Sequence, residues 1–78
     1  MHFVYILRCS NGDYYKGRTD DLKDRYRRHV EGRVPATAGL RPLELIFYCA
    51  FKDKYKAIEF EHYLKSGSGR AFMQKRLV

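Results

Sequence analysis

The sequence predicts an α+β domain, a small three-stranded antiparallel sheet flanked by helices in the order strand, strand, helix, strand, helix, with a short C-terminal helix. A hairpin signal near the N-terminus and two segments with helical spacing of apolar residues, separated by a continuous apolar run, predict this order. The chain has 78 residues, which leaves room for one domain, residues 1–78. The expected elements are strands 3–8, 13–18 and 43–51, helices 21–31 and 54–65, and a short helix after Gly69.

The N-terminal hairpin is predicted from two strand-like segments on either side of Ser10-Asn11-Gly12. Asn-Gly is a strong signal for a tight hairpin turn. A two-residue Asn-Gly loop would place Tyr5 and Tyr15 on opposite faces of the ribbon. A three-residue loop, with Gly12 in the left-handed position, shifts the register by one residue and places both tyrosines on the same face. We expect the three-residue loop, with the two tyrosines as diagonal neighbours.

The first helix is expected from about Asp21 to Glu31. Thr19 or Asp20 can cap its N-terminus, and Gly32 can end it. Four residues at helical spacing form the predicted inner face: Leu22, Tyr26, His29 and Val30.

Arg25 lies four residues before His29, so both side chains should lie on the same side of this helix, next to its apolar stripe. Residues 33–42 hold two prolines and two arginines and read as a basic loop with at most one helical turn. The continuous apolar run within Leu43–Phe51 favours a strand in the middle of the sheet or in a well-covered position.

The second long helix is expected from Lys54 to Lys65, with Asp53 as its cap and Ser66-Gly67 at its end. Its inner face contains a carboxylate among apolar residues: Ala57, Phe60, Glu61 and Leu64. A buried carboxylate is costly unless it is paired or holds a cation. Glu61 could form a buried pair with Arg25, and such a resting pair is compatible with a functional role. Glu59 is the rival carboxylate but falls outside the stripe. A short basic helix that contains Phe72, Met73 and Leu77 should close the chain.

Charge and composition narrow the class of protein. Sixteen Lys and Arg against nine Asp and Glu give a net charge of +7 and a pI near 9.7, as expected of a protein that binds phosphate. Charge alone also fits membranes, ribosomes or acidic proteins. No apolar run is long enough to span a bilayer and no signal peptide is evident, so we expect a cytoplasmic protein. Cys9 and Cys49 should be free thiols.

Four motifs occur in order along the chain: Val4-Tyr5-Ile6, Tyr15-Lys16-Gly17, Leu22-x-x-Arg25-x-x-x-His29 and Glu61-x-x-Leu64-Lys65. This order resembles the GIY-YIG nuclease family over nearly the whole chain, above all the small single-domain bacterial proteins related to the N-terminal nuclease domain of the excinuclease C subunit. Two positions depart from the family pattern. Val4 stands where Gly is usual, and Lys16 replaces an apolar residue, its side chain directed by the pleat away from the tyrosine face.

The resemblance implies phosphodiester hydrolysis with a single divalent ion, Mg²⁺ or Mn²⁺. Tyr5 would activate water or relay its proton beside Tyr15, Arg25 would stabilise charge on the phosphate, His29 would assist, and Glu61 would hold the metal. One carboxylate suffices for an ion that keeps most of its waters. Which of Tyr5, Tyr15 and His29 takes the proton stays open. The expected phosphate contacts are Lys16, Arg18, Arg27, Arg28, Arg33, Arg41 and Arg70.

Three functions compete on the sequence alone. The first is a DNA endonuclease of the repair or recombination type, a monomer that acts on an unusual DNA structure or is directed by a protein partner, because so small a chain has no second DNA-binding domain. RNA is an alternative substrate. The second is a GIY-YIG-like nucleic-acid-binding module with weak or no catalysis. The third, a basic adaptor for another protein, explains neither Glu61 nor the tyrosine pair. No Cys or His spacing indicates a zinc site.

Overall fold

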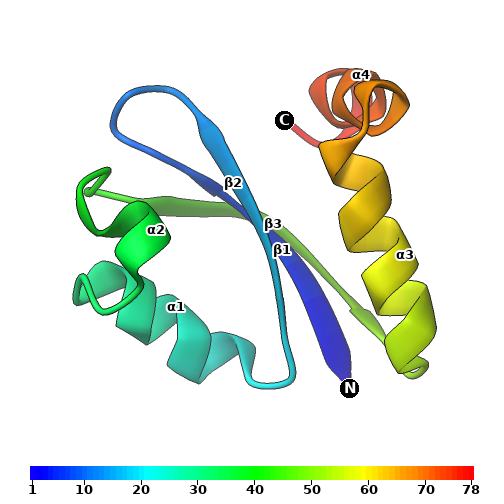
Figure 1. Cartoon of the computed structure of the whole chain (residues 1–78), viewed down its shortest axis with the longest axis horizontal. Coiled ribbons are helices and arrows are strands. Elements are labelled where there is room, and N and C mark those ends of the chain that lie inside the picture. The colour runs from blue at the N-terminus through cyan, green and yellow to red at the C-terminus, as the bar shows by residue number, and fades with distance from the viewer.

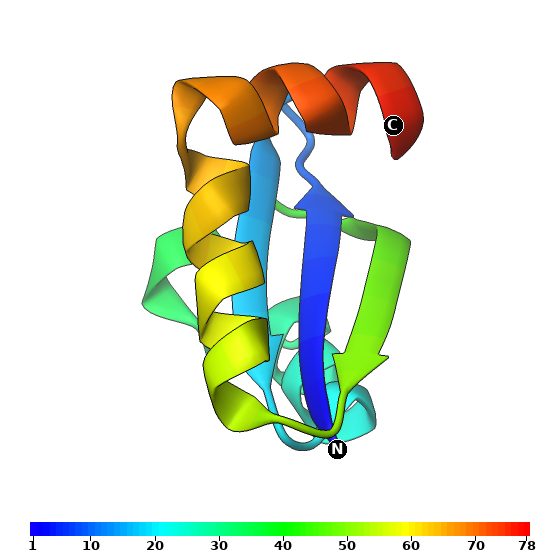
Figure 2. The same cartoon turned by 90° about the vertical axis from the view of Figure 1, so that its right-hand side faces the viewer.

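The computed structural model describes all residues, 1–78, and shows one three-stranded antiparallel sheet between two helical layers (Figure 1). The elements are β1 (His2–Arg8), β2 (Tyr14–Thr19), α1 (Leu22–Val30), α2 (Pro35–Ala38), β3 (Glu44–Phe51), α3 (Lys54–Lys65) and α4 (Gly67–Arg76). Helices α1 and α2 lie on one side of the sheet and α3 and α4 on the other; Figure 2 looks onto the α3 and α4 side, with α1 behind. The α+β class and the order of elements are confirmed.

The hairpin has the expected three-residue loop. Tyr5 pairs with Gly17 and Leu7 pairs with Tyr15. The last backbone bond before the loop runs from the Cys9 N–H to the Asp13 carbonyl, and Gly12 has a φ of +89°, the left-handed conformation that glycine adopts without strain. Tyr5 and Tyr15 therefore lie on one face, with ring centroids 6.3 Å apart.

The central strand is β1, because the strand order is β2-β1-β3. Two of its side chains, Val4 and Ile6, form the core with three residues from the helices, Ala57, Leu64 and Met73. Each fully buried aliphatic side chain stabilises the fold by about 1.5–3 kcal/mol. The other face of β1 carries Tyr5 and Leu7, which are also buried, toward α1 and α2.

The expectation that the third strand lies in the middle of the sheet is wrong: β3 is an edge strand, and Tyr48 within it is 56% exposed. One face of β3 packs on the core through residues such as Phe47 and Phe51. The register shifts where β1 passes from Ile6 to Leu7, so the apolar run includes a bulge as well as a partly open face. A long apolar run therefore occurs both in an edge strand with a bulge, as here, and in a strand that is buried on both faces.

Helix α1 begins at Leu22, one residue after the expected start, and its N-cap is Asp21 rather than Thr19 or Asp20. The Asp21 side chain accepts from the Asp24 N–H. The helix ends before Gly32, which has a φ of +77°. On the inner face, His29 is fully buried but Val30 is 50% exposed, so placing Val30 there was wrong. Neighbouring residues are about 100° apart around a helix, and the periodic pattern could not decide which of the two faces inward.

Helix α3 has its predicted bounds, with Asp53 accepting from the Tyr55 N–H as N-cap. Helix α4 begins at Gly67, before the expected start, because Ser66 caps it by accepting from the Gly69 N–H. A Cβ at Gly69 would lie 1.6 Å from the Tyr63 carbonyl oxygen, so only glycine allows so close an approach between the two helices.

Both cysteines are free thiols, as expected, with Cys9 buried and Cys49 half-buried. None of the helices combines the length and the apolar character needed to span a bilayer.

Candidate active site

Three aromatic side chains meet on the face of the sheet that α1 covers. The Tyr5 hydroxyl lies 2.8 Å from Nε2 of His29. The His29 ring meets both tyrosines edge to face, with centroids 5.6 Å from Tyr5 and 5.2 Å from Tyr15. Tyr5 and His29 are 2% and 0% exposed. The cluster thus joins β1, β2 and α1, as the hairpin register required.

Gly17 makes room for this cluster. It lies opposite Tyr5, and a Cβ at position 17 would lie 2.4 Å from both Cζ and the hydroxyl oxygen of Tyr5. The Tyr5 ring therefore crosses β2 directly over the Gly17 backbone. Gly17, the last residue of the second tripeptide, must therefore lack a side chain so that Tyr5, the tyrosine of the first tripeptide, has room for its ring.

Thr37, on α2, also belongs to this cluster and was not predicted from the sequence. Its hydroxyl lies 2.7 Å from Nδ1 of His29, and it is fully buried. Thr37 lies in α2, which begins with Pro35 at its first turn. A threonine in a proline-containing loop carries no sequence signal of its own. The expected burial of His29 offered the only hint, since a buried imidazole needs a partner at each nitrogen.

Burial and neighbouring charges shift the pKa values in this cluster. Burial raises the pKa of Tyr5 well above its ordinary value, and Tyr15 and Glu61 raise it further, whereas the Arg25 cation lowers it. Burial and then Arg25 lower the pKa of His29. Arg25 therefore acts on both groups, in agreement with its predicted place beside His29, and the resting cluster is uncharged.

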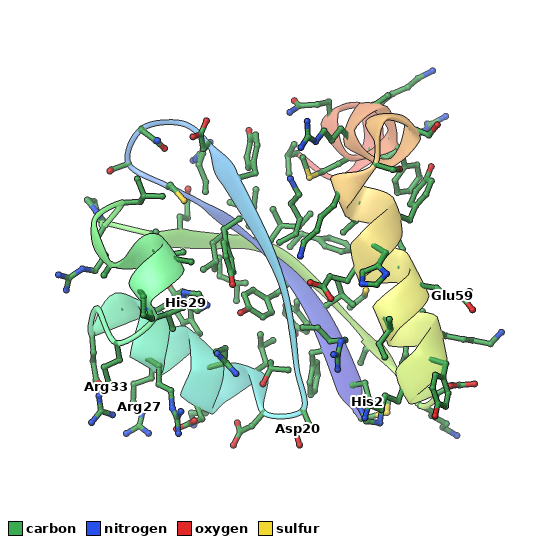
Figure 3. All side chains as sticks on the ribbon, in the orientation of Figure 1. His2, Asp20, Arg27, His29, Arg33 and Glu59 are labelled. Atoms are coloured by element: carbon green, nitrogen blue, oxygen red, sulfur yellow. The ribbon has the colours of Figure 1, made fainter.

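Glu61 lies on the other side of β2, on α3. Its side chain is only 14% exposed and pairs with Lys65 Nζ at 2.8 Å and Arg18 Nε at 3.7 Å. The alternative of a buried pair with Arg25 is therefore wrong. Arg18 alternates with Gly17 along β2, so it projects to the α3 side of the sheet, while Arg25 lies on the opposite side. The Glu61 charge nevertheless acts on the Tyr5 hydroxyl across this edge strand. Glu59 is exposed and points away from the sheet (Figure 3).

The predicted phosphate-binding residues fall into separate groups. Burial, Arg70 and Lys65 lower the pKa of Lys16, which places these three cations close together on the α3 and α4 side. Lys16 and Arg70 line a surface cavity of about 440 Å³ between the hairpin and α4. With Arg18 they form a basic patch, defined as Lys16, Arg18, Lys65 and Arg70, around Glu61.

The other predicted arginines lie elsewhere. Arg27 and Arg28 pair with Asp24, and Arg33 pairs with Glu31, near the C-terminal half of α1 (Figure 3). Arg41 bonds the carbonyls of Ala38 and Val30 and packs its guanidinium against Gly32, so its role is to hold the loop. Sequence position alone could not show that these arginines lie apart from those around Glu61.

The donors available for a metal ion are few. No three His, Cys, Asp or Glu side chains come together in the structure, and Glu61 is the carboxylate whose charge raises the pKa of Tyr5. A single hard oxygen ligand fits a hydrated ion such as Mg²⁺, which takes its remaining ligands from water and a substrate phosphate. Glu61 therefore fits the metal that the motif order implies.

The hairpin tyrosines, the α1 histidine and the α3 carboxylate belong to four motifs whose order along the chain resembles the GIY-YIG pattern. The family model for the GIY-YIG catalytic domain matches residues 1–76, and the chain belongs to this family. Its relatives include the UPF0213 protein YazA of Bacillus subtilis, 38% identical over 82% of this chain and 66% of that protein. The UPF0213 protein of Lacticaseibacillus paracasei is 37% identical over 82% of this chain and 73% of its own length.

The fold also matches a solved structure. The solution NMR structure of the UPF0213 protein BH0048 from Bacillus halodurans has a TM-score of 0.61 and 36% identity, covering 94% of this chain and 79% of that one. The expected family and fold class are thereby confirmed. The catalytic domain family makes nuclease chemistry the class of activity to which this site belongs.

Proposed function

We propose that the chain is a divalent-metal-dependent endonuclease that hydrolyses DNA phosphodiester bonds. The observation that carries this proposal is the convergence of one hydrogen bond, one aromatic contact and two opposite charges on the Tyr5 side chain. His29 bonds it, Tyr15 lies against it, and Arg25 and Glu61 act on it with opposite charge. Ordinary strand packing of a tyrosine does not require these partners.

In the proposed reaction, the buried Tyr5 hydroxyl orients or deprotonates the attacking water. Because the pKa of Tyr5 is raised, its phenolate needs stabilisation from Arg25 and from a second cation near Glu61. Arg25 also stabilises negative charge that develops on the phosphate. Glu61 would hold the metal, and a bound divalent ion supplies Lewis-acid polarisation of the phosphate. Tyr15 and His29 hold the Tyr5 ring in place.

The proposed substrate is DNA with an unusual structure, or DNA that a partner protein presents. The basic patch of Lys16, Arg18, Lys65 and Arg70 lies beside Glu61 and could hold a phosphate chain there. A monomeric domain of 78 residues offers little further surface for sequence readout. A cytoplasmic role in DNA repair fits such a substrate.

A second function is favoured by one observation. Lys65 and Arg18 already neutralise Glu61. The carboxylate could therefore serve only to hold the basic patch together, in a domain that binds nucleic acid without cutting it.

Cleavage assays separate the two functions. The protein is incubated with single-stranded, duplex, flap and branched DNA, each with Mg²⁺, Mn²⁺ or EDTA. The matched variants are Glu61→Gln and Glu59→Gln, since Glu59 is an exposed carboxylate on the same helix. The endonuclease cuts at least one substrate only with metal, loses cutting in Glu61→Gln and in Arg25→Ala, and keeps it in Glu59→Gln. Salt-sensitive binding with no cutting of any substrate supports the binding module instead.

A further inference from the structure

Three buried side chains form a continuous hydrogen-bonded row from the sheet to α2. Tyr5 Oη lies 2.8 Å from Nε2 of His29, and Nδ1 of His29 lies 2.7 Å from Thr37 Oγ1. A neutral imidazole has one N–H donor and one acceptor nitrogen. Whichever group donates at one nitrogen therefore decides what the other nitrogen does.

The direction of the row follows from the Thr37 hydroxyl. Its proton has two acceptors within reach, Nδ1 of His29 at 2.7 Å and the Val34 carbonyl oxygen at 3.5 Å. The Val34 carbonyl already accepts the backbone N–H groups of Thr37 and Ala38, both at 3.0 Å. A separation of 3.5 Å is beyond the usual range for an O–H···O bond, whereas 2.7 Å is typical for a hydroxyl donor. The Thr37 proton therefore points to Nδ1.

We propose that Thr37 is a positioning residue that holds His29 in the tautomer protonated at Nε2, so that His29 donates a hydrogen bond to the Tyr5 oxygen. The catalytic part of this inference depends on the proposed nuclease function; the tautomer does not. In this arrangement His29 does not accept the Tyr5 proton. Its N–H instead stabilises the phenolate oxygen when Tyr5 releases its proton to a water molecule, which passes it to solvent. This hydrogen bond offsets part of the cost of burying the phenolate.

The surroundings of His29 support a neutral ring. The groups that face it are Tyr5 and Tyr15 from the sheet, Arg25 from its own helix and Thr37 from α2. None of them is an anion in the resting state, and Arg25 is a cation. A protonated His29 would need Thr37 to accept at Nδ1 and to turn its own proton to the distant Val34 carbonyl. Helix α2 thus places the Thr37 hydroxyl where it donates to the neutral His29 ring.

Long-range ¹H–¹⁵N correlation spectra of the His29 ring test the tautomer directly. They are recorded near pH 8 on ¹⁵N-labelled wild type, Thr37→Ser, which keeps the hydroxyl, and Thr37→Val, which keeps the shape without it. We expect a protonated Nε2 and an unprotonated Nδ1 in wild type and in Thr37→Ser, and loss of this single tautomer in Thr37→Val. A protonated Nδ1 in wild type overturns the proposal, and so does a Thr37→Val spectrum identical to wild type. If Thr37→Val fails to fold, the wild-type and Thr37→Ser spectra still decide.

Cleavage kinetics on the same variants test the consequence. We expect Thr37→Val to lower kcat by about 10- to 100-fold with KM little changed, as is typical for loss of a hydrogen bond that orients a functional histidine, and Thr37→Ser to restore most of it. A folded Thr37→Val with wild-type kcat refutes the positioning role. If the wild type cuts no DNA, the proposed nuclease function fails, whereas the tautomer assignment is still decided by the spectra.

Discussion

Gly17 lies directly opposite Tyr5 in the hairpin, and the Tyr5 ring occupies the space where a side chain at position 17 would be. This one relationship explains why the last position of the second tripeptide is glycine although its backbone is an ordinary strand. It also allows the Tyr5 ring to pass over the Gly17 backbone and reach His29. The geometry of the site therefore depends on an absent Cβ as much as on the side chains present.

Replacing Gly17 with alanine should displace the Tyr5 ring and break its bond to His29. We expect Gly17→Ala to lower the free energy of unfolding by about 1–3 kcal/mol, as overpacking usually does, and to impair cleavage. Gly67→Ala is the matched control, because nothing lies within 4 Å of its Cβ; it should be neutral or slightly stabilising. Urea unfolding measures both. A Gly17→Ala protein as stable and as active as wild type would contradict the close approach.

Stability should fall in mild acid because of His29. Its pKa is lowered from the ordinary value of 6.5, so between the two values the unfolded chain binds more protons than the native protein. Stability therefore falls as the pH drops through about 6.5 and levels off below the native pKa. Each unit of lowering costs about 1.4 kcal/mol.

The matched variant for this test is His29→Gln, which removes the buried imidazole and leaves His2 and His62 in place. Urea unfolding between pH 8 and pH 5 gives the difference in stability between wild type and variant. As the pH falls, the free energy of unfolding of wild type should decrease relative to that of His29→Gln. A difference that is constant over this range would mean that the pKa of His29 is not lowered.

Lys65 should compete with a metal ion for Glu61, since its ammonium lies 2.8 Å from a carboxylate oxygen. Lys65 is half-exposed and lies four residues after Glu61 on the helix, and ion pairs of this kind are worth about 0.3–1 kcal/mol. Lys65→Met should therefore bind Mn²⁺ roughly 2- to 5-fold more tightly in the absence of DNA. Lys56→Met on the same helix, which makes no ion pair with Glu61, should bind as wild type does. Isothermal titration measures the affinities. Unchanged or weaker binding by Lys65→Met would show that Glu61 is not the metal ligand.

The basic patch should make DNA binding dependent on salt. Neutralising Lys16 or Arg70 removes one phosphate contact each, so the slope of log Kd against log salt should fall by about one for each substitution to Gln. Lys52→Gln is the control, because Lys52 precedes α3, at the opposite end of that helix from Lys65 (Figure 2). Equal slopes for Arg70→Gln and wild type would place the phosphates elsewhere.

The fold could be predicted from the sequence wherever local chemistry decides the structure. The three-residue loop Ser10-Asn11-Gly12 defined the register that brings Tyr5 and Tyr15 together. Asp53 and Ser66 lie at the two ends of α3, as expected. The edge position of β3 could not be predicted, because strand order is a tertiary property that a continuous apolar run does not encode.

The site could be predicted only where local sequence patterns place a residue. His29 was expected on the inner face of α1, but its partner Thr37 comes from a loop with no periodic pattern. The pairing of Glu61 with Arg18 rather than Arg25 depends on which side of the sheet each helix packs, and helical spacing says nothing about that. Contacts between elements that are far apart in the sequence could therefore not be predicted, whereas the contact of Tyr5 with Tyr15 across the hairpin could.

The most direct test of the proposed catalytic cluster is the cleavage rate of Tyr5→Phe beside that of Tyr14→Phe, measured on whichever DNA the wild type cuts. Tyr5→Phe keeps the ring and removes only the hydroxyl that bonds His29, whereas Tyr14 packs against the core on the opposite face of the sheet. We expect Tyr5→Phe to cut at least about 100-fold more slowly, the lower range of a lost general base, and Tyr14→Phe to cut near the wild-type rate. A folded Tyr5→Phe that cuts as fast as wild type would contradict the assignment of this cluster as the catalytic centre.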